Sequence, residues 1–132
     1  METIQTKTAE FSYIEKDIIQ VRLFENARIE IKDVEESFTA TMNIAEHKKY
    51  AVLVDATPYV YVTPEARIHG ARKEFQLNLV AQAIFVTSLA NRIVGNFIIR
   101  FNKPYAPTKL FSDKESALEW LREQLKRNKA DY

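Results

Sequence analysis

The chain has 132 residues, of which 46% are hydrophobic and 28% are charged. This length fits one domain with a normal core, and the composition is typical of a globular protein rather than a disordered one. The sequence contains no cysteine, which excludes disulfides, thiolate zinc sites and cysteine nucleophiles. We predict a single domain over residues 1–132, with a core from about residue 9 to residue 127.

The net charge of +1 is unevenly distributed along the chain. Residues 1–55 contain 7 basic and 11 acidic residues, a net charge of −4, whereas residues 56–109 contain 7 basic and 2 acidic residues, a net charge of +5. Such asymmetry can attract an anionic ligand or the acidic patch of a partner, although solvated helix faces produce the same pattern.

The chain shows no targeting or membrane-spanning pattern. Met1–Glu10 is polar and lacks the apolar region of a signal peptide. The longest apolar runs, Leu79–Leu89 and Ile93–Phe101, fall short of the ~20 residues that span a bilayer and contain polar residues. We therefore expect a cytoplasmic protein.

The chain opens with two short runs rich in β-branched and aromatic residues, Phe11–Tyr13 and Ile18–Leu23. Glu15–Asp17 separates them, which predicts a β-hairpin. Because this turn has no glycine, we expect a loop built on a type I turn rather than a tight primed turn.

A helix and a buried strand follow the hairpin. Asp33–Glu36 resembles a capping box in which Asp33 caps the helix and Glu36 folds back. Apolar residues continue from there at helical spacing, namely Val34, Phe38, Met42 and Ala45. Tyr50–Val54 is a continuous apolar run, which is typical of a central strand covered on both faces.

The next helix begins at Thr63, because threonine can cap a helix and proline suits the first helical position. Glu65 adds an acid to the first turn. The predicted buried stripe is Ile68, Ala71 and Phe75. Leu79–Val86 then reads as a second buried strand.

Ser88 can cap a third helix that ends before Pro104. Its broad apolar face consists of Leu89, Ile93, Val94, Phe97, Ile98 and Phe101. We expect this face to pack against the sheet. Contact with lipid, a hydrophobic pocket and a dimer interface remain open as alternatives.

A short strand at Lys109–Phe111 precedes a fourth helix. Ser112–Glu115 has the pattern of a capping box, and the helix is expected to bury Ala117, Leu118, Leu121 and Leu125. After the hairpin, strands alternate with helices. This order predicts an α/β fold with a mostly parallel sheet and four helices.

No catalytic, metal or cofactor signature is present. The two histidines, His47 and His69, belong to different predicted helices and have no second imidazole at helical spacing. Gly70 and Gly95 do not open a helix after a strand, which excludes the phosphate-binding glycine loops. We therefore expect a protein that is not an enzyme, with Asp55 and His69 as the remaining candidates for unrecognised chemistry.

Nucleic-acid binding has only a weak signal. Tyr59, Tyr61, Arg67 and Arg72 combine aromatic and basic side chains, but the local charge is modest. Tyrosines that cover the edge of a core explain the same pattern, so we expect no nucleic-acid partner.

Several segments resemble the SpoIIAA-like proteins of the STAS/SEC14 superfamily, which are small bacterial domains. The similar segments are Ala51–Thr57, Tyr59–Val62, Thr63–Arg67, Asn102–Phe111 and Ser112–Leu121. The resemblance extends over about residues 9 to 124. It implies one domain with an N-terminal β-hairpin, alternating strands and helices, and a mostly parallel mixed sheet.

The resemblance also concerns the segment between the first buried strand, Tyr50–Val54, and the helix that begins at Thr63. In STAS domains of the anti-sigma-antagonist type, a strand ends in an aspartate, and the following helix begins at a phosphorylatable serine. If Asp55 is that aspartate, Thr63 stands at the aspartate of the Asp-Ser-Ser segment, and Pro64 and Glu65 replace the serines. The phosphoacceptor is missing, and we interpret Glu65 as a first-turn acid rather than a mimic of phosphate.

The resemblance implies a non-enzymatic regulatory or interaction module that works without a cofactor. It would bind a protein partner or a small anionic ligand at the strand-to-helix junction 55–72. The candidate binding residues are Asp55, Thr57, Tyr59, Tyr61, Thr63, Glu65, Arg67 and Arg72.

An alternative follows from the SEC14-like relatives, which bind hydrophobic ligands. In this alternative the protein carries a hydrophobic ligand or binds a membrane surface through helix 89–103. The residues concerned are Phe97, Ile98 and Phe101. A homodimer is compatible with either interpretation.

Overall fold

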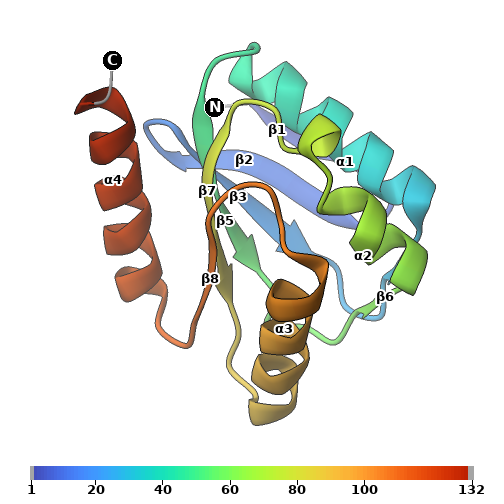
Figure 1. The fold of residues 1–132 in the computed structure, drawn as a ribbon. Helices are drawn as coiled ribbons and strands as arrows, with labels where there is room; N and C mark the ends of the chain where they lie inside the picture. Colours follow the sequence, from blue (N-terminus) through green and yellow to red (C-terminus); the bar gives the residue numbers. More distant parts are fainter. Residues whose placement is uncertain (1, 131–132) are drawn as a thin grey trace.

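The computed structural model describes residues 2–130, which form a mixed six-stranded sheet, a small second sheet and four α-helices (Figure 1). The strands are β1 (Thr3–Gln5), β2 (Ala9–Glu15), β3 (Ile18–Leu23), β4 (Arg28–Ile29), β5 (Tyr50–Asp55), β6 (Tyr61–Val62), β7 (Leu79–Phe85) and β8 (Thr108–Phe111). The helices are α1 (Ile31–Ala45), α2 (Pro64–Gly70), α3 (Leu89–Asn102) and α4 (Lys114–Ala130), with a 3-10 turn η1 at Lys73–Phe75. The predicted α/β class is confirmed.

The large sheet has the strand order β1-β2-β3-β5-β7-β8. The first two pairs are antiparallel, and the pairs from β3 to β8 are parallel. The sheet is therefore mostly parallel, as predicted. Sequence patterns missed β1, and they also missed β4 and β6, which pair in the second sheet. These strands are only two or three residues long, so they carry no periodic signal.

The opening hairpin is present between β2 and β3. Its turn residues are Lys16 and Asp17, and of these two only Asp17 has a positive φ, 64°. A primed hairpin turn needs a positive φ at its first central residue, so the turn is not of that kind. The pairing also shifts register between Tyr13 and Glu15.

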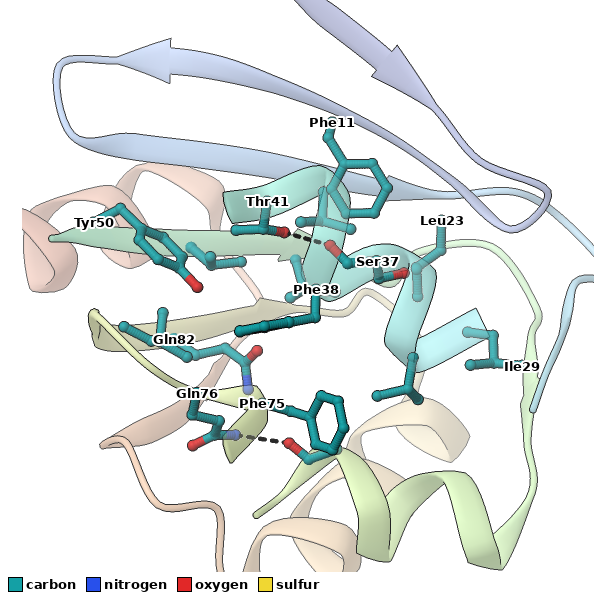
Figure 2. Close-up of a pocket in the computed structure, with 16 residues that line it drawn as sticks. Phe11, Leu23, Ile29, Ser37, Phe38, Thr41, Tyr50, Phe75, Gln76 and Gln82 are labelled. Atoms are coloured by element: carbon teal, nitrogen blue, oxygen red, sulfur yellow. Dashed lines mark hydrogen bonds between the residues drawn. The ribbon is translucent and has the colours of Figure 1, made fainter. Parts of the chain in front are cut away.

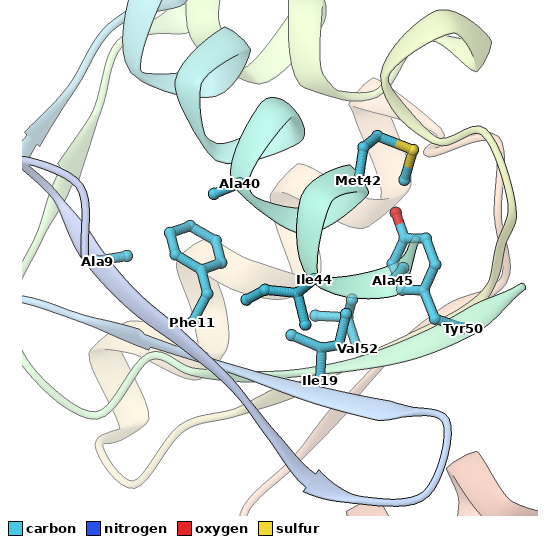
Figure 3. Packing of buried hydrophobic residues seen from close by; sticks show 9 residues of the cluster. All are labelled: Ala9, Phe11, Ile19, Ala40, Met42, Ile44, Ala45, Tyr50 and Val52. Carbon is cyan, nitrogen blue, oxygen red and sulfur yellow. The ribbon is translucent and has the colours of Figure 1, made fainter. Parts of the chain in front are cut away.

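Strand β5 lies in the middle of the sheet, and its side chains are buried alternately on the two faces. Tyr50 and Val52 pack with residues of α1 and β2 (Figure 3). Ala51 and Leu53 pack on the other face, in the cluster that contains α4 residues. Figure 1 shows α1 and α2 on one side of the sheet and α4 on the other. The predicted two-sided burial is confirmed.

The start of α1 differs from the prediction. The helix begins at Ile31 with Glu30 as its N-cap residue, and the Glu30 N–H donates to Asp33 Oδ2 at 2.9 Å. Asp33 thus has the role predicted for Glu36, the acid that reaches back to the cap. Two pairs of acids have the spacing of a capping box, Glu30 with Asp33 and Asp33 with Glu36. Of these three acids only Asp33 is buried, with 1% of its surface exposed.

Helix α2 begins as predicted but is short. Thr63 is the N-cap residue, and Pro64 is the first of seven helical residues. Ala66 is the buried residue of α2, whereas Ile68 is 52% exposed, so the predicted stripe is wrong at Ile68. The chain leaves the helix at Gly70, and Phe75 packs against Phe38 from η1 instead. A stripe at helical spacing cannot extend across this break.

Helix α4 buries Ala117, Leu118 and Leu121 against the sheet, as predicted, whereas Leu125 is only partly buried. Its first turn is capped by Asp113 rather than Ser112, because Asp113 Oδ2 accepts from the N–H and the hydroxyl of Ser116. These two hydrogen bonds hold the pKa of Asp113 below its ordinary value.

Arg122 joins α4 to the opening hairpin through hydrogen bonds to Glu15. It donates from Nε and Nη2 to the two carboxylate oxygens of Glu15, at 2.9 and 2.8 Å. These hydrogen bonds lower the pKa of Glu15.

Burial raises the pKa of Tyr50, which lies in the middle of the core. The unfolded chain ionises tyrosine near pH 10, so above that pH it loses a proton that the folded protein retains. The stability of the folded state must therefore fall as pH rises. In Tyr50→Phe we expect a smaller loss of unfolding free energy between about pH 9 and pH 11 than in the wild type, measured by urea denaturation.

The matched control is Tyr59→Phe, because the Tyr59 side chain is exposed. It should lose stability with pH as the wild type does. Equal pH dependence in wild type and Tyr50→Phe would contradict the assignment.

Candidate functional site

The predicted junction and the start of α3 lie side by side at the carboxyl ends of β5 and β7. Asp55 and Phe85, the last residues of these strands, are paired in register. The Ala56 N–H donates to the Phe85 carbonyl at 2.9 Å, and Asn91 Nδ2 of α3 donates to the Ala56 carbonyl at 3.4 Å. The two surfaces considered from the sequence therefore adjoin one another.

Asp55 and Thr57 bond to each other. Asp55 Oδ1 accepts from the Thr57 N–H at 3.1 Å and from the Thr57 hydroxyl at 2.7 Å. This is a local side-chain-to-backbone turn, which fixes the direction of the chain as it leaves β5. Both side chains are half-buried and already have a structural partner.

Thr63 also has a structural role. Its side chain is buried, and its Oγ1 accepts from the Ala66 N–H at 3.1 Å. Glu65 is exposed in the first turn of α2, where an acid favours the helix dipole. Of these two predicted binding residues, Glu65 alone presents its side chain to solvent.

Two tyrosines form the aromatic part of the junction. Tyr59 is 64% exposed and Tyr61 is 44% exposed. The Arg28 guanidinium lies over the Tyr61 ring, 5.1 Å from its centroid. The Asn26 N–H donates to the Tyr59 carbonyl at 2.7 Å, so β4 and its preceding loop hold this segment in place. Both rings are available for contact.

The two arginines of the junction differ. Arg72 is exposed just after α2. Arg67 is half-buried, and its Nε is buried without a hydrogen-bond partner among the described residues. The exposed part of the predicted site is therefore Tyr59, Tyr61, Glu65 and Arg72.

Asp55 and His69, the candidates for unrecognised chemistry, each contact other residues and do not form a common site among the described contacts. His69 Nε2 lies 3.6 Å from Glu35 Oε2, and its ring lies against Phe75 with centroids 4.4 Å apart. The Asp55 carboxylate accepts its hydrogen bonds from Thr57, as described above. Among residues 2–130, no group of three or more histidine, aspartate or glutamate side chains is arranged to hold a metal ion.

Helix α3 turns its most apolar side to solvent. Five large apolar side chains on it are each more than half exposed, namely Leu89, Ile93, Val94, Phe97 and Phe101. Ile93, Phe97 and Phe101 follow at intervals of four and form one stripe, in which the two phenylalanine rings are 4.4 Å apart. The expectation that this face packs against the sheet is therefore wrong.

The inner side of α3 combines small and polar residues, Asn91, Gly95 and Asn102, with two half-buried isoleucines, Ile98 and Ile99. Gly95 lies so close to β8 that a Cβ there would be 2.9 Å from Leu110 Cδ1. Asn91 bonds to the chain after β5, and Ile98 is only half-buried. Because glycine permits this close approach, the helix packs through Gly95, and its apolar stripe points outward. Of the three predicted surface residues, Phe97 and Phe101 are exposed and Ile98 is not.

The charges on α3 have one sign. Arg92 and Arg100 are exposed on the helix, and Lys103 is exposed at its C-cap. Residues 89–103 contain no acidic residue. The Arg100 guanidinium lies 5.7 Å from the centroid of the Phe101 ring, at the edge of the apolar stripe. No helix among the described residues is long and apolar enough to cross a membrane.

A cavity of about 200 Å³ lies between α1, α2 and the sheet (Figure 2). Most side chains around it are apolar, including Phe11, Phe38 and Phe75. Gln76 at its margin donates to the Gly70 carbonyl at 3.2 Å and accepts from the Ala106 N–H at 2.6 Å. The cavity is smaller than the roughly 300–1,000 Å³ that ligand pockets usually offer, so it adds little to the carrier alternative.

The exposure of Leu89, Ile93 and Val94 is a feature that sequence reasoning missed. A signal was nonetheless present, because Asn91, Gly95 and Asn102 fall on the side of the helix opposite the apolar stripe. A helix that packs by such a side leaves its apolar side uncovered. Hydrophobic patterning alone does not reveal which side faces the sheet.

Comparison with known proteins agrees with this architecture. A family model described as "Domain of unknown function (DUF7793)" matches residues 12–125. An uncharacterised protein of the DUF3478 family from Shewanella loihica PV-4, with a SpoIIAA-like fold, is similar in structure, with a TM-score of 0.59 and 16% sequence identity. The similarity covers 86% of this chain and 91% of that one. The chain therefore has a SpoIIAA-like fold, as the sequence resemblance predicts.

A second solved structure, a protein of unknown function from Arthrobacter sp. FB24, has a TM-score of 0.32 and 22% identity. This similarity covers 85% of this chain and 97% of that one, but its TM-score is too low to bear on the fold. Comparison with curated protein sequences gives no match.

The geometry of Thr63 predicts a structural effect of its removal. Thr63→Ala deletes the acceptor for the Ala66 N–H, and loss of an N-cap side chain costs about 0.5–2 kcal/mol. We expect a lower midpoint of urea denaturation in Thr63→Ala, whereas Thr63→Ser, which keeps the oxygen, should retain most of the stability. An unchanged midpoint in Thr63→Ala would show that the side chain is free for another role.

Proposed function

The chain belongs to the DUF7793 family of domains of unknown function, and we propose that it is a non-enzymatic binding module that attaches to an anionic membrane surface through α3. The observation that carries the proposal is the outward apolar stripe of α3. Its attachment would be peripheral, on the cytoplasmic side. This corresponds to the membrane-surface alternative formed from the sequence.

The exposed apolar side chains of α3 favour attachment to an apolar surface. Full burial of a leucine, isoleucine, valine or phenylalanine side chain is worth about 1.5–3 kcal/mol. Five such side chains on α3 remain more than half exposed, so several kcal/mol of hydrophobic free energy are available to a partner surface. A helix with this pattern can lie in the plane of a membrane interface with its apolar side in the acyl region.

The basic residues of α3 favour a surface that is also anionic. Arg100 borders the apolar stripe at Phe101, Arg92 and Lys103 are exposed elsewhere on the helix and at its C-cap, and residues 89–103 contain no acidic residue. Each basic residue near an anionic lipid surface contributes about 1 kcal/mol. A symmetric dimer through α3 would instead bring these like charges together, which opposes association. An anionic membrane therefore complements both the apolar and the charged parts of α3.

A second candidate is the regulatory interaction module at the junction 55–72, which would bind a protein partner or a small anionic ligand. It is favoured by the two exposed rings, Tyr59 and Tyr61, and by the exposed Arg72 of the same junction. Tyrosine and arginine are enriched among the residues that dominate binding energy at protein interfaces. Asp55, Thr57 and Thr63 would support this surface from beneath rather than contact the partner.

Vesicle binding tests the membrane proposal. Purified protein should co-sediment with phosphatidylglycerol vesicles more strongly than with phosphatidylcholine vesicles, and binding should weaken as salt is raised. Phe97→Glu places a charge in the apolar stripe and should weaken binding to the anionic vesicles by about tenfold or more.

Leu77→Glu is the matched control, because Leu77 is also exposed but lies outside α3. It should bind vesicles as the wild type does. Equal vesicle binding by Phe97→Glu and the wild type, or no binding by the wild type, would reject the proposal. A dimer that covers α3 would appear in sedimentation velocity as a species that Phe97→Glu dissociates.

The second candidate is tested with the tyrosines. If the junction binds a protein partner, the Tyr59→Ala and Arg72→Glu variants should each lose that partner from affinity captures that succeed with the wild type, while Phe97→Glu retains it. The captured protein would be identified by mass spectrometry. Identical captures by all four proteins would remove the junction from consideration.

A further inference from the structure

Strand β8 leaves one edge of the large sheet open. It is the last strand in the sheet order and pairs with β7 alone among the described residues. An unpaired edge offers a row of N–H and C=O groups on which another extended segment can pair. Residues Thr108–Phe111 of this edge strand contain no proline, so each of them carries a backbone N–H.

The direction of the backbone groups along β8 follows from its bonds to β7. The Gln82 N–H donates to the Pro107 carbonyl, and the Val86 N–H donates to the Phe111 carbonyl, each at 2.9 Å. Alternate residues of a strand direct their backbone groups to the same side. The backbone groups of Thr108 and Leu110 therefore point away from β7, toward the open edge.

A groove runs along this edge. It has a volume of about 370 Å³ and lies between α3 and the chain at residues 108–112. Arg92, Asn96 and Ile99 line its helix side, and they follow one another at helical spacing on one face of α3. The combination of an open strand edge and a parallel wall of helix side chains can hold one extended peptide.

We propose that this groove binds an acidic extended peptide, which pairs with β8 as a seventh strand of the sheet. The groove contains two cationic residues, Arg92 and Lys109, and none of the residues that line it is acidic. Leu110 lies on the face of the sheet that Gly95 of α3 contacts, and its neighbour Lys109 lies on the opposite face, beside Phe111. Neighbouring carboxylate side chains of an extended peptide also point to opposite faces. One can therefore reach Arg92 and the next can reach Lys109 while the peptide backbone bonds to Thr108 and Leu110.

Lys109 does not block the edge. Its Nζ lies over the Phe111 ring, 5.3 Å from the centroid, so its side chain follows one face of the strand. A second copy of the chain is a poorer occupant, because two-fold pairing of β8 with itself would bring the two basic grooves together. Charge complementarity therefore selects an acidic peptide over a second copy.

This site is separate from the apolar stripe of α3, and the two proposals can fail independently. The stripe faces solvent through Ile93, Phe97 and Phe101, whereas the groove uses the Arg92 side of the same helix. Phe97→Glu tests vesicle binding without altering the groove, and Lys109→Glu tests the groove without altering the stripe.

The experiment measures fluorescence anisotropy of labelled peptides with the full chain. The first peptide repeats two glutamates and one threonine, the second repeats two lysines and one threonine, and the third is the acidic peptide with an N-methyl group on every residue. The acidic peptide should bind, with a Kd on the order of 10–100 μM, and the other two should bind about tenfold more weakly or worse. N-methylation removes backbone donors and keeps the charge, so it separates strand pairing from charge attraction.

Protein variants and amide exchange complete the test. Lys109→Glu should weaken binding of the acidic peptide by about tenfold, while Lys126→Glu on the exposed side of α4 should leave it unchanged. In the wild type, the peptide should protect the N–H groups of Thr108 and Leu110 from hydrogen exchange.

Three results would overturn the proposal. They are no binding of the acidic peptide at about 1 mM, equal binding of the N-methylated peptide, and unchanged exchange at Thr108 and Leu110. Displacement of the acidic peptide by phosphatidylglycerol vesicles together with unchanged exchange would assign the groove to lipid headgroups instead.

Discussion

The burial of β5 on both faces is the constraint on which the rest of the structure depends. Tyr50 and Val52 fill the space under α1, while Ala51 and Leu53 contact the cluster under α4. A strand buried in this way needs neighbours on both edges and layers on both faces. The order of the sheet follows, and with it the position of Asp55, where β5 ends beside the start of α3.

The carboxyl ends of the parallel strands concentrate the functional candidates at one end of the sheet. The chain turns sharply after β5 through the hydrogen bonds between Asp55 and Thr57, and Asn91 links that turn to α3. Asp55, Thr57 and Thr63, which the sequence suggested as binding residues, instead form hydrogen bonds that hold this region together. What they support is a surface of exposed tyrosines next to a helix with an exposed apolar stripe.

The amphipathic helix α3 packs on the sheet through the side that carries Gly95 and exposes its most apolar side. Gly95 lets the helix approach Leu110 closely, and this contact decides which side of the helix is hidden. A hydrophobic stripe normally identifies the buried side of a helix, but here it identifies the side left for a partner. The same orientation directs Arg92 toward the open edge of β8, so one helix borders two different surfaces.

The amino-acid sequence by itself determined the α/β class, the central strands and the helix starts at Thr63 and Ser88. These features arise from local capping and from hydrophobic periodicity, which act over a few neighbouring residues. Tertiary structure alone decided which acid caps α1, which side of α3 is exposed, and that β8 has a free edge. These outcomes depend on contacts such as that between Gly95 and Leu110, which join segments distant in the chain, whereas capping and hydrophobic periodicity act only between near neighbours.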